Sequence, residues 1–427
     1  MHRRAFLATP MGAYYAFPQL APPNEVIEQS RAVALKLLSP SERQIRHGLE
    51  LHAKSRVVES YGFMPRAAID GDAIGAAIES GASDLEIQDL MEEHGMTRYV
   101  VSAAERKEYL DAWRASGVTC ILQNAGEEGS APMRLIKRLG RYTYVTHHLR
   151  DHVSQAIVPD DIPAARKAGR HCVTMTGNGV PIPQDWVSVE EELRYIRVFF
   201  QLGVRMMHLT YNRRNALGDG CGEPGNAGLS DFGHAAIAEM NRTGVIVDVA
   251  HSGWRTSLEA AKASKKPMVA SHTTCTALHR HIRSKPDEVI KAICDTGGLI
   301  GICCIPEFVG GTRDIRAMLD HIDYAVKKFG ADHVAIGTDV AYVSRNANAE
   351  YRKLPKRGRQ RTRWEALWPP GALGGATQEQ SRSMAWTNWP VFTIGMVQRG
   401  HSDATIAKIL GENVMRVLRA NFDGVKV

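Results

Sequence analysis

Two short apolar segments of the chain each end in a histidine. The first occupies residues 245–251 and ends at His251, and the second occupies residues 267–272 and ends at His272. Both are short, apolar and rich in Val and Ile, which favours buried strands, and residues 254–265 between them place apolar side chains at helical spacing. A strand, a helix and a strand in close succession predict a βαβ unit, whose parallel strands end at the same edge of a sheet. We therefore expect His251 and His272 to lie side by side.

A pair of neighbouring imidazoles can bind a metal ion. Neutral imidazole is a good ligand for Zn²⁺, and a bound zinc ion can polarise a carbonyl and lower the pKa of a water molecule. The alternative is that His251 and His272 are unrelated histidines in two loops. The residues at the ends of the other predicted strands favour the metal site.

Six further apolar segments, separated by helical stretches, complete a set of eight predicted strands. They are residues 67–70, 118–123, 172–176, 204–210, 299–304 and 334–339. Predicted helices include residues 185–202, 230–242, 286–296 and 315–329, with Ser230 as an N-cap. Eight strands that alternate with helices predict the α/β class, as a (β/α)8 TIM barrel. A doubly wound open sheet is the alternative, but no Gly-x-Gly-x-x-Gly motif follows the first predicted strand.

The predicted barrel takes up most of the chain. The 427 residues are 44% hydrophobic and 23% charged, an ordinary globular composition. We predict an N-terminal helical cap at residues 1–65, with a helix at 39–60, and the barrel with C-terminal helices at residues 66–427. A long insertion at residues 340–385 follows the eighth strand, so it either covers the active-site mouth or forms a solvated or subunit-contacting loop. Its basic and aromatic residues are Arg352, Lys353, Lys356, Arg357, Arg359, Arg361, Arg363, Trp364 and Trp368.

The net charge of +7 does not identify a partner. Lys and Arg are spread along the predicted helices and no known nucleic-acid-binding fold surrounds the basic insertion, so we expect no nucleic acid. No run reaches the roughly 18 apolar residues of a membrane span. The seven cysteines form no Cys-x-x-Cys pair, which favours reduced thiols and a cytoplasmic location. The alternative is export through a twin-arginine signal at Arg3 and Arg4.

Polar side chains follow the ends of the other predicted strands. Asp339 ends the eighth strand, where a carboxylate can take a proton from an attacking water. Arg283 lies in the loop after the sixth strand, where its guanidinium can bind a substrate carboxylate; a surface ion pair is the alternative. The remaining strand-end candidates are Asp70, Asp72, Asn178 and Tyr211.

Several ordered segments carry a common pattern. They are residues 202–205, 209–212, 228–233, 239–244, 248–251, 271–272, Arg283 with 286–287, 337–339, 411–414 and 416–417. With these segments the chain resembles the membrane (renal) dipeptidase family of amidohydrolase-like metallopeptidases. The resemblance implies a zinc-dependent barrel that hydrolyses dipeptides or related amides at a binuclear site, and it implies a homodimer. At matched positions it implies that His251 and His272 bind the second metal, Arg283 binds the substrate carboxylate and Asp339 transfers a proton.

Four positions depart from the family pattern. The family's first strand ends in an Asp-Gly-His-x-Asp motif whose last two named residues bind the first metal, and the matching stretch here is Asp-Gly-Asp-Ala-Ile at residues 70–74. Thr176 replaces a bridging glutamate, and Tyr211 replaces a histidine that contacts the scissile group of the substrate. A neutral threonine removes the charge that would hold two cations close together.

These departures predict an altered, mononuclear site. His251 and His272 hold one zinc ion in this interpretation, completed by Asp339 or water. Asp70 or Asp72 adds a weak extra ligand. Two zinc ions, as in the family, are the alternative.

Three functions are compatible with these residues. The first is a metal-dependent hydrolase of a small carboxylate-bearing amide or dipeptide-like substrate, with Asp339 as catalytic base and Arg283, Tyr211 and Asn178 around the substrate. The second is a barrel enzyme of another class, a lyase, isomerase or tailoring enzyme that uses one metal or none, with Tyr211 as its acid or base. The third is a non-catalytic ligand binder. The polar strand-end residues favour the first function, because an inert barrel needs none of them.

Overall fold

The computed structural model describes residues 24–126, 129–356 and 367–425. Its main sheet consists of parallel strands in the order β1-β2-β4-β5-β6-β7-β9-β10. β1 and β10, at the two ends of this order, contact each other, and the Asp339 N–H donates to the Tyr61 carbonyl between them (3.4 Å). The eight strands therefore form a nearly closed barrel, and the predicted (β/α)8 architecture is confirmed. Their bounds are β1 Val58–Gly62, β2 Cys120–Asn124, β4 His171–Gly177, β5 Val204–His208, β6 Ile246–Asp248, β7 Val269–Cys275, β9 Leu299–Ile302 and β10 Val334–Ile336.

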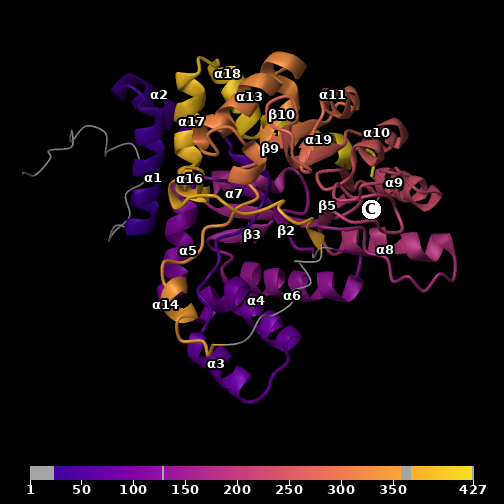
Figure 1. Ribbon diagram of the computed structural model, residues 1–427, viewed down its shortest axis with the longest axis horizontal. Coiled ribbons are helices and arrows are strands. Elements are labelled where there is room, and N and C mark those ends of the chain that lie inside the picture. Colours follow the sequence, from indigo (N-terminus) through magenta and orange to yellow (C-terminus); the bar gives the residue numbers. More distant parts are fainter. Residues whose placement is uncertain (1–23, 127–128, 357–366, 426–427) are drawn as a thin grey trace, which may run out of the picture.

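Helices surround this barrel (Figure 1). The helices on the N-terminal half are α1 Glu25–Leu38, α2 Glu42–Lys54, α3 Gly71–Glu79, α4 Asp84–Val101, α5 Ala103–Ser116, α6 Pro132–His148, α7 Asp161–Lys167 and α8 Val189–Gln201. Those on the C-terminal half are α9 Asp231–Thr243, α10 Trp254–Ala263, α11 Asp287–Asp295, α12 Pro306–Val309, α13 Ile315–Phe329, α14 Ala347–Tyr351, α16 Gln378–Ser383, α17 Trp389–Gln398, α18 Asp403–Ala407 and α19 Asn413–Phe422. Short segments complete the chain: β3 Val153–Gln155, β8 Ser284–Lys285, η1 Ala331–His333, η2 Trp386–Asn388 and η3 Lys408–Glu412. The predicted N-cap of α9 is confirmed, because the Ser230 hydroxyl accepts a hydrogen bond from the Gly233 N–H (3.0 Å).

The first strand lies elsewhere than predicted. β1 spans Val58–Gly62, whereas residues 67–70 form no strand and Asp70 caps α3 by accepting from the Ala73 N–H (3.1 Å). The helix expected at 39–60 ends at Lys54. Glu59 lies fully buried inside β1, and a charged residue interrupts the apolar run that indicates a buried strand. The barrel therefore begins within the segment that the sequence assigns to the N-terminal cap.

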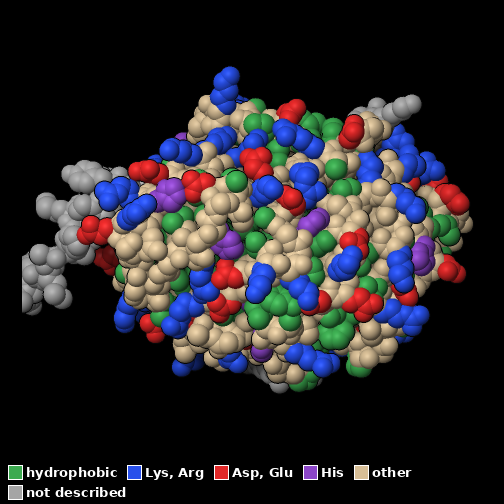
Figure 2. Space-filling view, turned by 90° about the horizontal axis from the view of Figure 1, so that it is seen from above, with side chains coloured by type: hydrophobic (Ala, Val, Ile, Leu, Met, Phe, Trp, Pro, Cys, Tyr) green, Lys and Arg blue, Asp and Glu red, His purple; other side chains and the backbone are tan. Residues whose placement is uncertain are grey.

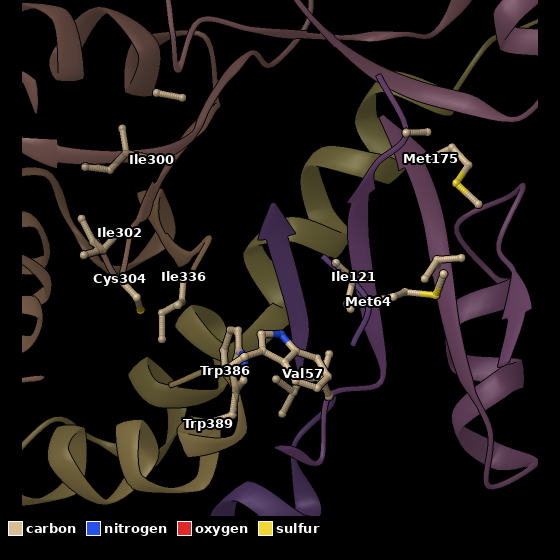
Figure 3. Close-up of a cluster of buried hydrophobic side chains, with 14 of the residues drawn as sticks. Val57, Met64, Ile121, Met175, Ile300, Ile302, Cys304, Ile336, Trp386 and Trp389 are labelled. Carbon is tan, nitrogen blue, oxygen red and sulfur yellow. The ribbon is translucent and has the colours of Figure 1, made fainter. Parts of the chain in front are cut away.

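Apolar side chains of the strands and of the C-terminal segment form the main core. Figure 3 shows ten of them, all almost fully buried: Val57, Met64, Ile121, Met175, Ile300, Ile302, Cys304, Ile336, Trp386 and Trp389. Burial of each large apolar side chain contributes about 1.5–3 kcal/mol. The Trp386 indole N–H also donates to the Glu59 carboxylate (2.8 Å), so it ties the C-terminal segment to β1.

The surface carries both signs of charge. Figure 2 shows basic and acidic side chains interspersed over the face seen from above. Of the helices within the described ranges, none combines the length and the apolar character that a membrane crossing requires. All seven cysteines are free thiols, and most of them are buried. Arg3 and Arg4, the basis of the alternative export prediction, lie outside the described residues.

Candidate functional site

His251 and His272 meet near the carboxyl ends of two neighbouring strands of the barrel. His251 follows β6 and His272 lies in β7, and these two strands pair in the sheet. Their Nε2 atoms are 3.0 Å apart, and both side chains are buried. The structure therefore brings two ring nitrogens to a common point.

Each ring is oriented through its other nitrogen. His251 Nδ1 lies 2.7 Å from the Asn212 side-chain oxygen, and His272 Nδ1 lies 2.9 Å from the Ser271 hydroxyl. Because an amide oxygen only accepts, His251 carries its proton on Nδ1 and offers a lone pair on Nε2. Burial, followed by the positive charge of Arg283, lowers the pKa of both histidines well below the ordinary value. Both imidazoles are therefore neutral, which is the form that binds metals.

Aromatic rings enclose the histidine pair. Tyr61, on β1, stacks on His272 with ring centroids 3.8 Å apart, and Tyr211 stacks on His251 at 4.0 Å. Trp368 approaches the His251 ring edge-on at 6.3 Å. Since Trp368 belongs to the 340–385 insertion, this part of the insertion reaches the site. Arg357, Arg359, Arg361, Arg363 and Trp364 of the same insertion lie outside the described residues.

Arg283 is buried against the backbone of the histidine strands. Its terminal nitrogens donate to the Ala250 carbonyl and to the His272 carbonyl, the latter at 3.2 Å. The Nε atom is buried and has no hydrogen-bond partner among the described residues. Lys285, two residues on, donates to the Ser252 carbonyl (2.5 Å), and burial lowers its pKa to about 7. Two cations thus lie next to the histidine pair with carbonyl partners.

Tyr61 contacts the Asp339 backbone and the Asn178 side chain. The Asp339 N–H donates to the Tyr61 carbonyl (3.4 Å), and the Tyr61 hydroxyl donates to the Asn178 side-chain oxygen (2.7 Å). Asp339 has a φ of +59°, so its backbone is in the left-handed region as the chain leaves β10. Its negative charge contributes to raising the pKa of buried Glu59 to about 8, although burial is the main cause.

Asp70 and Asp72 form a separate group at α3. Asp70 lies 3.3 Å from an Arg98 guanidinium nitrogen, and the exposed Asp72 lies 2.7 Å from the Lys353 ammonium. Their carboxylates gather with that of Glu350, beside α14 at the lower end of Figure 1. Because β1 ends at Gly62, the large side chains at the end of the first strand are those of Tyr61, within it, and Phe63, directly after it, and the structure does not bring Asp70 or Asp72 to the histidine pair.

His208 and Asp248, two residues that the sequence pattern does not single out, lie next to the histidine pair. His208 ends β5 and Asp248 ends β6, as register partners with Nε2 and Oδ2 2.7 Å apart. The His208 ring centroid is 5.3 Å from that of His251 and 5.4 Å from that of His272. Burial would raise the pKa of Asp248, but its contact with His208 and the hydrogen bonds from Ser271 hold this pKa below its ordinary value. The sequence feature that could have identified them is an ionisable residue at the end of each of two successive apolar segments.

Known proteins resemble this chain in sequence and in fold. The model of the family "Membrane dipeptidase (Peptidase family M19)" matches residues 50–353. Dipeptidase tcpJ of Claviceps purpurea is 27% identical over 274 residues, which cover 63% of this chain and 55% of that protein. Dipeptidase aclJ of Aspergillus oryzae is 33% identical over 150 residues, 34% of this chain and 36% of that protein. The chain thus spans about half, or less, of these relatives. An amidohydrolase of Pseudomonas aeruginosa has a similar solved structure, with a TM-score of 0.64, 25% identity, and coverage of 88% of this chain and 99% of that one.

Proposed function

Because the chain belongs to the membrane dipeptidase family of metallopeptidases, we propose that it hydrolyses a small, carboxylate-bearing amide or dipeptide-like substrate at a mononuclear zinc site. The observation that carries this proposal is the convergence of two neutral imidazole nitrogens, 3.0 Å apart, at the carboxyl ends of β6 and β7. In a barrel of this kind the active site lies at that end of the strands.

His251 and His272 fit the metal that the family implies. Their Nε2 atoms face one point, their Nδ1 atoms are held by Asn212 and Ser271, and their lowered pKa values keep them unprotonated. Such outer partners fix the ring orientation of metal-binding histidines. A zinc ion held there supplies Lewis acidity and lowers the pKa of a bound water.

The neighbouring strand ends support one ion over two. β1 and β4 end at the site in Tyr61, Phe63, Thr176 and Asn178. None of these is an acid or an imidazole, and the Thr176 hydroxyl donates to the Gln123 carbonyl (3.1 Å). A second cation close to the first would meet no carboxylate there to offset their repulsion.

The remaining residues have roles in binding and proton transfer under this proposal. Arg283 has a buried Nε–H that can pair with a substrate carboxylate, while its other nitrogens hold the backbone at Ala250 and His272. Asp339 takes the proton of the attacking water. Asn178, which accepts from the Tyr61 hydroxyl, and Tyr211, which stacks on His251, orient the substrate.

A second candidate is a barrel enzyme of another reaction class. Tyr211 stacks directly on His251, so its hydroxyl is carried on a fixed ring beside the pair, as an acid or base requires. A lyase, isomerase or tailoring enzyme would use this group in place of peptide hydrolysis. Activity measurements distinguish the two.

Metal analysis and dipeptide hydrolysis test the proposed function. We expect one tightly bound zinc ion per chain and hydrolysis of dipeptides. His272→Ala should reduce turnover by more than about 100-fold, because loss of even an outer partner of a metal ligand costs about 10–100-fold. His52→Gln is the control, since His52 is a buried histidine whose ring nitrogens contact the Thr393 hydroxyl and the Ser116 carbonyl, which precedes the amino end of β2. Unchanged turnover in His272→Ala would contradict hydrolysis at this pair.

A further inference from the structure

We propose that His208 is a third imidazole ligand of the same metal centre, with Asp248 as the carboxylate that orients it. The inference rests on the proposed metal dependence and adds a ligand from β5, so that three consecutive strands of the barrel each contribute one histidine. No position in the sequence pattern discussed above assigns this role to His208.

The three rings are arranged as ligands of one ion. Their centroids are separated by 5.3 Å between His208 and His251, 5.4 Å between His208 and His272, and 5.0 Å between His251 and His272. Three imidazoles bound tetrahedrally at a Zn–N distance of about 2.0–2.1 Å have ring centres roughly 5 Å apart. One ligand atom each from His208, Asp248 and His272 lies within 4.8 Å of the others, a group that links His208 to His272, includes the Asp248 carboxylate and does not include His251.

Each of the three rings has one nitrogen in contact with a neighbouring polar side chain. His251 and His272 are held through Nδ1, and His208 is held through Nε2 by its 2.7 Å contact with Asp248. Both ring nitrogens of His208 are buried and have no hydrogen-bond partner among the described residues; Nε2 has the ion-pair contact with Asp248, and Nδ1 has none in that pair. A buried polar nitrogen without a partner is costly and uncommon, and a metal ion would satisfy it.

Asp248 connects the three histidines. One of its oxygens accepts from the Ala250 N–H (2.9 Å) and the Ser271 N–H (3.1 Å), the residues that immediately precede His251 and His272. The other oxygen faces His208. A carboxylate that bonds the far nitrogen of a metal-binding histidine is a recurrent arrangement in zinc sites. The same carboxylate therefore sets both the His208 ring and the backbone of the other two ligands.

A purely structural His208–Asp248 pair is the competing explanation, and zinc affinity separates the two. Zinc dissociation constants are to be measured by chelator competition for the wild-type chain, His208→Gln, Asp248→Asn and the buried control His52→Gln, each checked for folding by circular dichroism. We expect His208→Gln to weaken zinc binding by more than about 100-fold and Asp248→Asn by about 10–100-fold. His52→Gln should bind as the wild type does.

Cobalt substitution provides a readout that is independent of activity. The visible absorption of bound Co²⁺ should change in position and intensity in His208→Gln, because a nitrogen ligand is lost, and should stay constant in His52→Gln. Folded His208→Gln with wild-type zinc affinity and an unaltered cobalt spectrum would overturn the inference, as would a wild-type chain that binds no metal. If His208 is required for zinc binding but no dipeptide is hydrolysed, the proposed function fails and the ligand assignment stands.

Discussion

At the residue scale, the site contains two buried cations, Arg283 and Lys285, that form no ion pair with a carboxylate among the described residues. Arg283 and Lys285 donate to the carbonyls of Ala250, His272 and Ser252. Their positive charges, together with burial, keep the two imidazoles unprotonated. The free-energy cost of removing the charge from water is larger for Lys285 than for Arg283, because an ammonium is more strongly hydrated than a guanidinium.

Replacement of Lys285 tests this cost through its pH dependence. The pKa is lowered from 10.5 to about 7 in the folded chain, so between these values the unfolded chain binds the proton and the folded chain does not. Wild-type stability should therefore rise with pH across this window. Lys285→Met removes the effect, so its stability relative to the wild type should be greater near about pH 6 than near about pH 9.5, by on the order of 3 kcal/mol. Urea unfolding at both pH values measures the difference in unfolding free energy between the variant and the wild type. Lys262→Met, at an exposed lysine, is the control. A difference for Lys285→Met that is the same at both pH values would contradict the prediction.

At the element scale, β6 and β7 could be predicted from the sequence and β1 could not. Residues 245–251 and 267–272, around β6 and the start of β7, are mostly apolar and each ends in a histidine, so the meeting of His251 and His272 could be predicted from their succession. β1 contains Glu59, whose carboxylate is satisfied by Thr338 and Trp386, residues remote in sequence. Those partners come close to Glu59 only in the folded chain, so β1 could not be recognised from the sequence. The sequence therefore predicts the first strand at residues 67–70 and Asp70 at the site, which is wrong.

Close backbone packing between strands positions His272. The Ser60 hydroxyl donates to the Ser271 carbonyl (2.7 Å), and a Cβ at Gly301 of β9 would collide with both groups. Gly301→Ala should therefore displace β7 next to His272, destabilise the fold by about 1–3 kcal/mol and weaken zinc binding. Gly140→Ala is a matched control, because its Cβ would face open space in α6 and should stabilise the helix by about 0.5–1 kcal/mol. If Gly301→Ala were as stable as the wild type, the close contact between β9 and β7 at Ser271 would not limit the side chain at this position.

At the scale of the whole molecule, the centre links parts of the chain that are distant in sequence. β5, β6 and β7 supply its histidines, β1 supplies the stacked Tyr61, and the insertion supplies Trp368. A ligand that binds only when these parts are assembled stabilises the folded state relative to the unfolded state. Metal binding and global stability should therefore be coupled.

This coupling predicts that removal of zinc lowers the unfolding temperature. At a free zinc concentration about 100 times the dissociation constant, the folded chain gains about 2.7 kcal/mol, which for a large domain corresponds to a rise of roughly 2–4 °C. Differential scanning calorimetry with zinc and with a chelator measures the difference. His272→Ala should abolish the difference between zinc and chelator, because the convergent Nε2 pair is lost. His52→Gln should lower the unfolding temperature in both conditions and keep the difference between them. A wild-type unfolding temperature that is the same in zinc and in chelator would mean that the assembled strand ends hold no ion, since a ligand selective for the folded state must raise it.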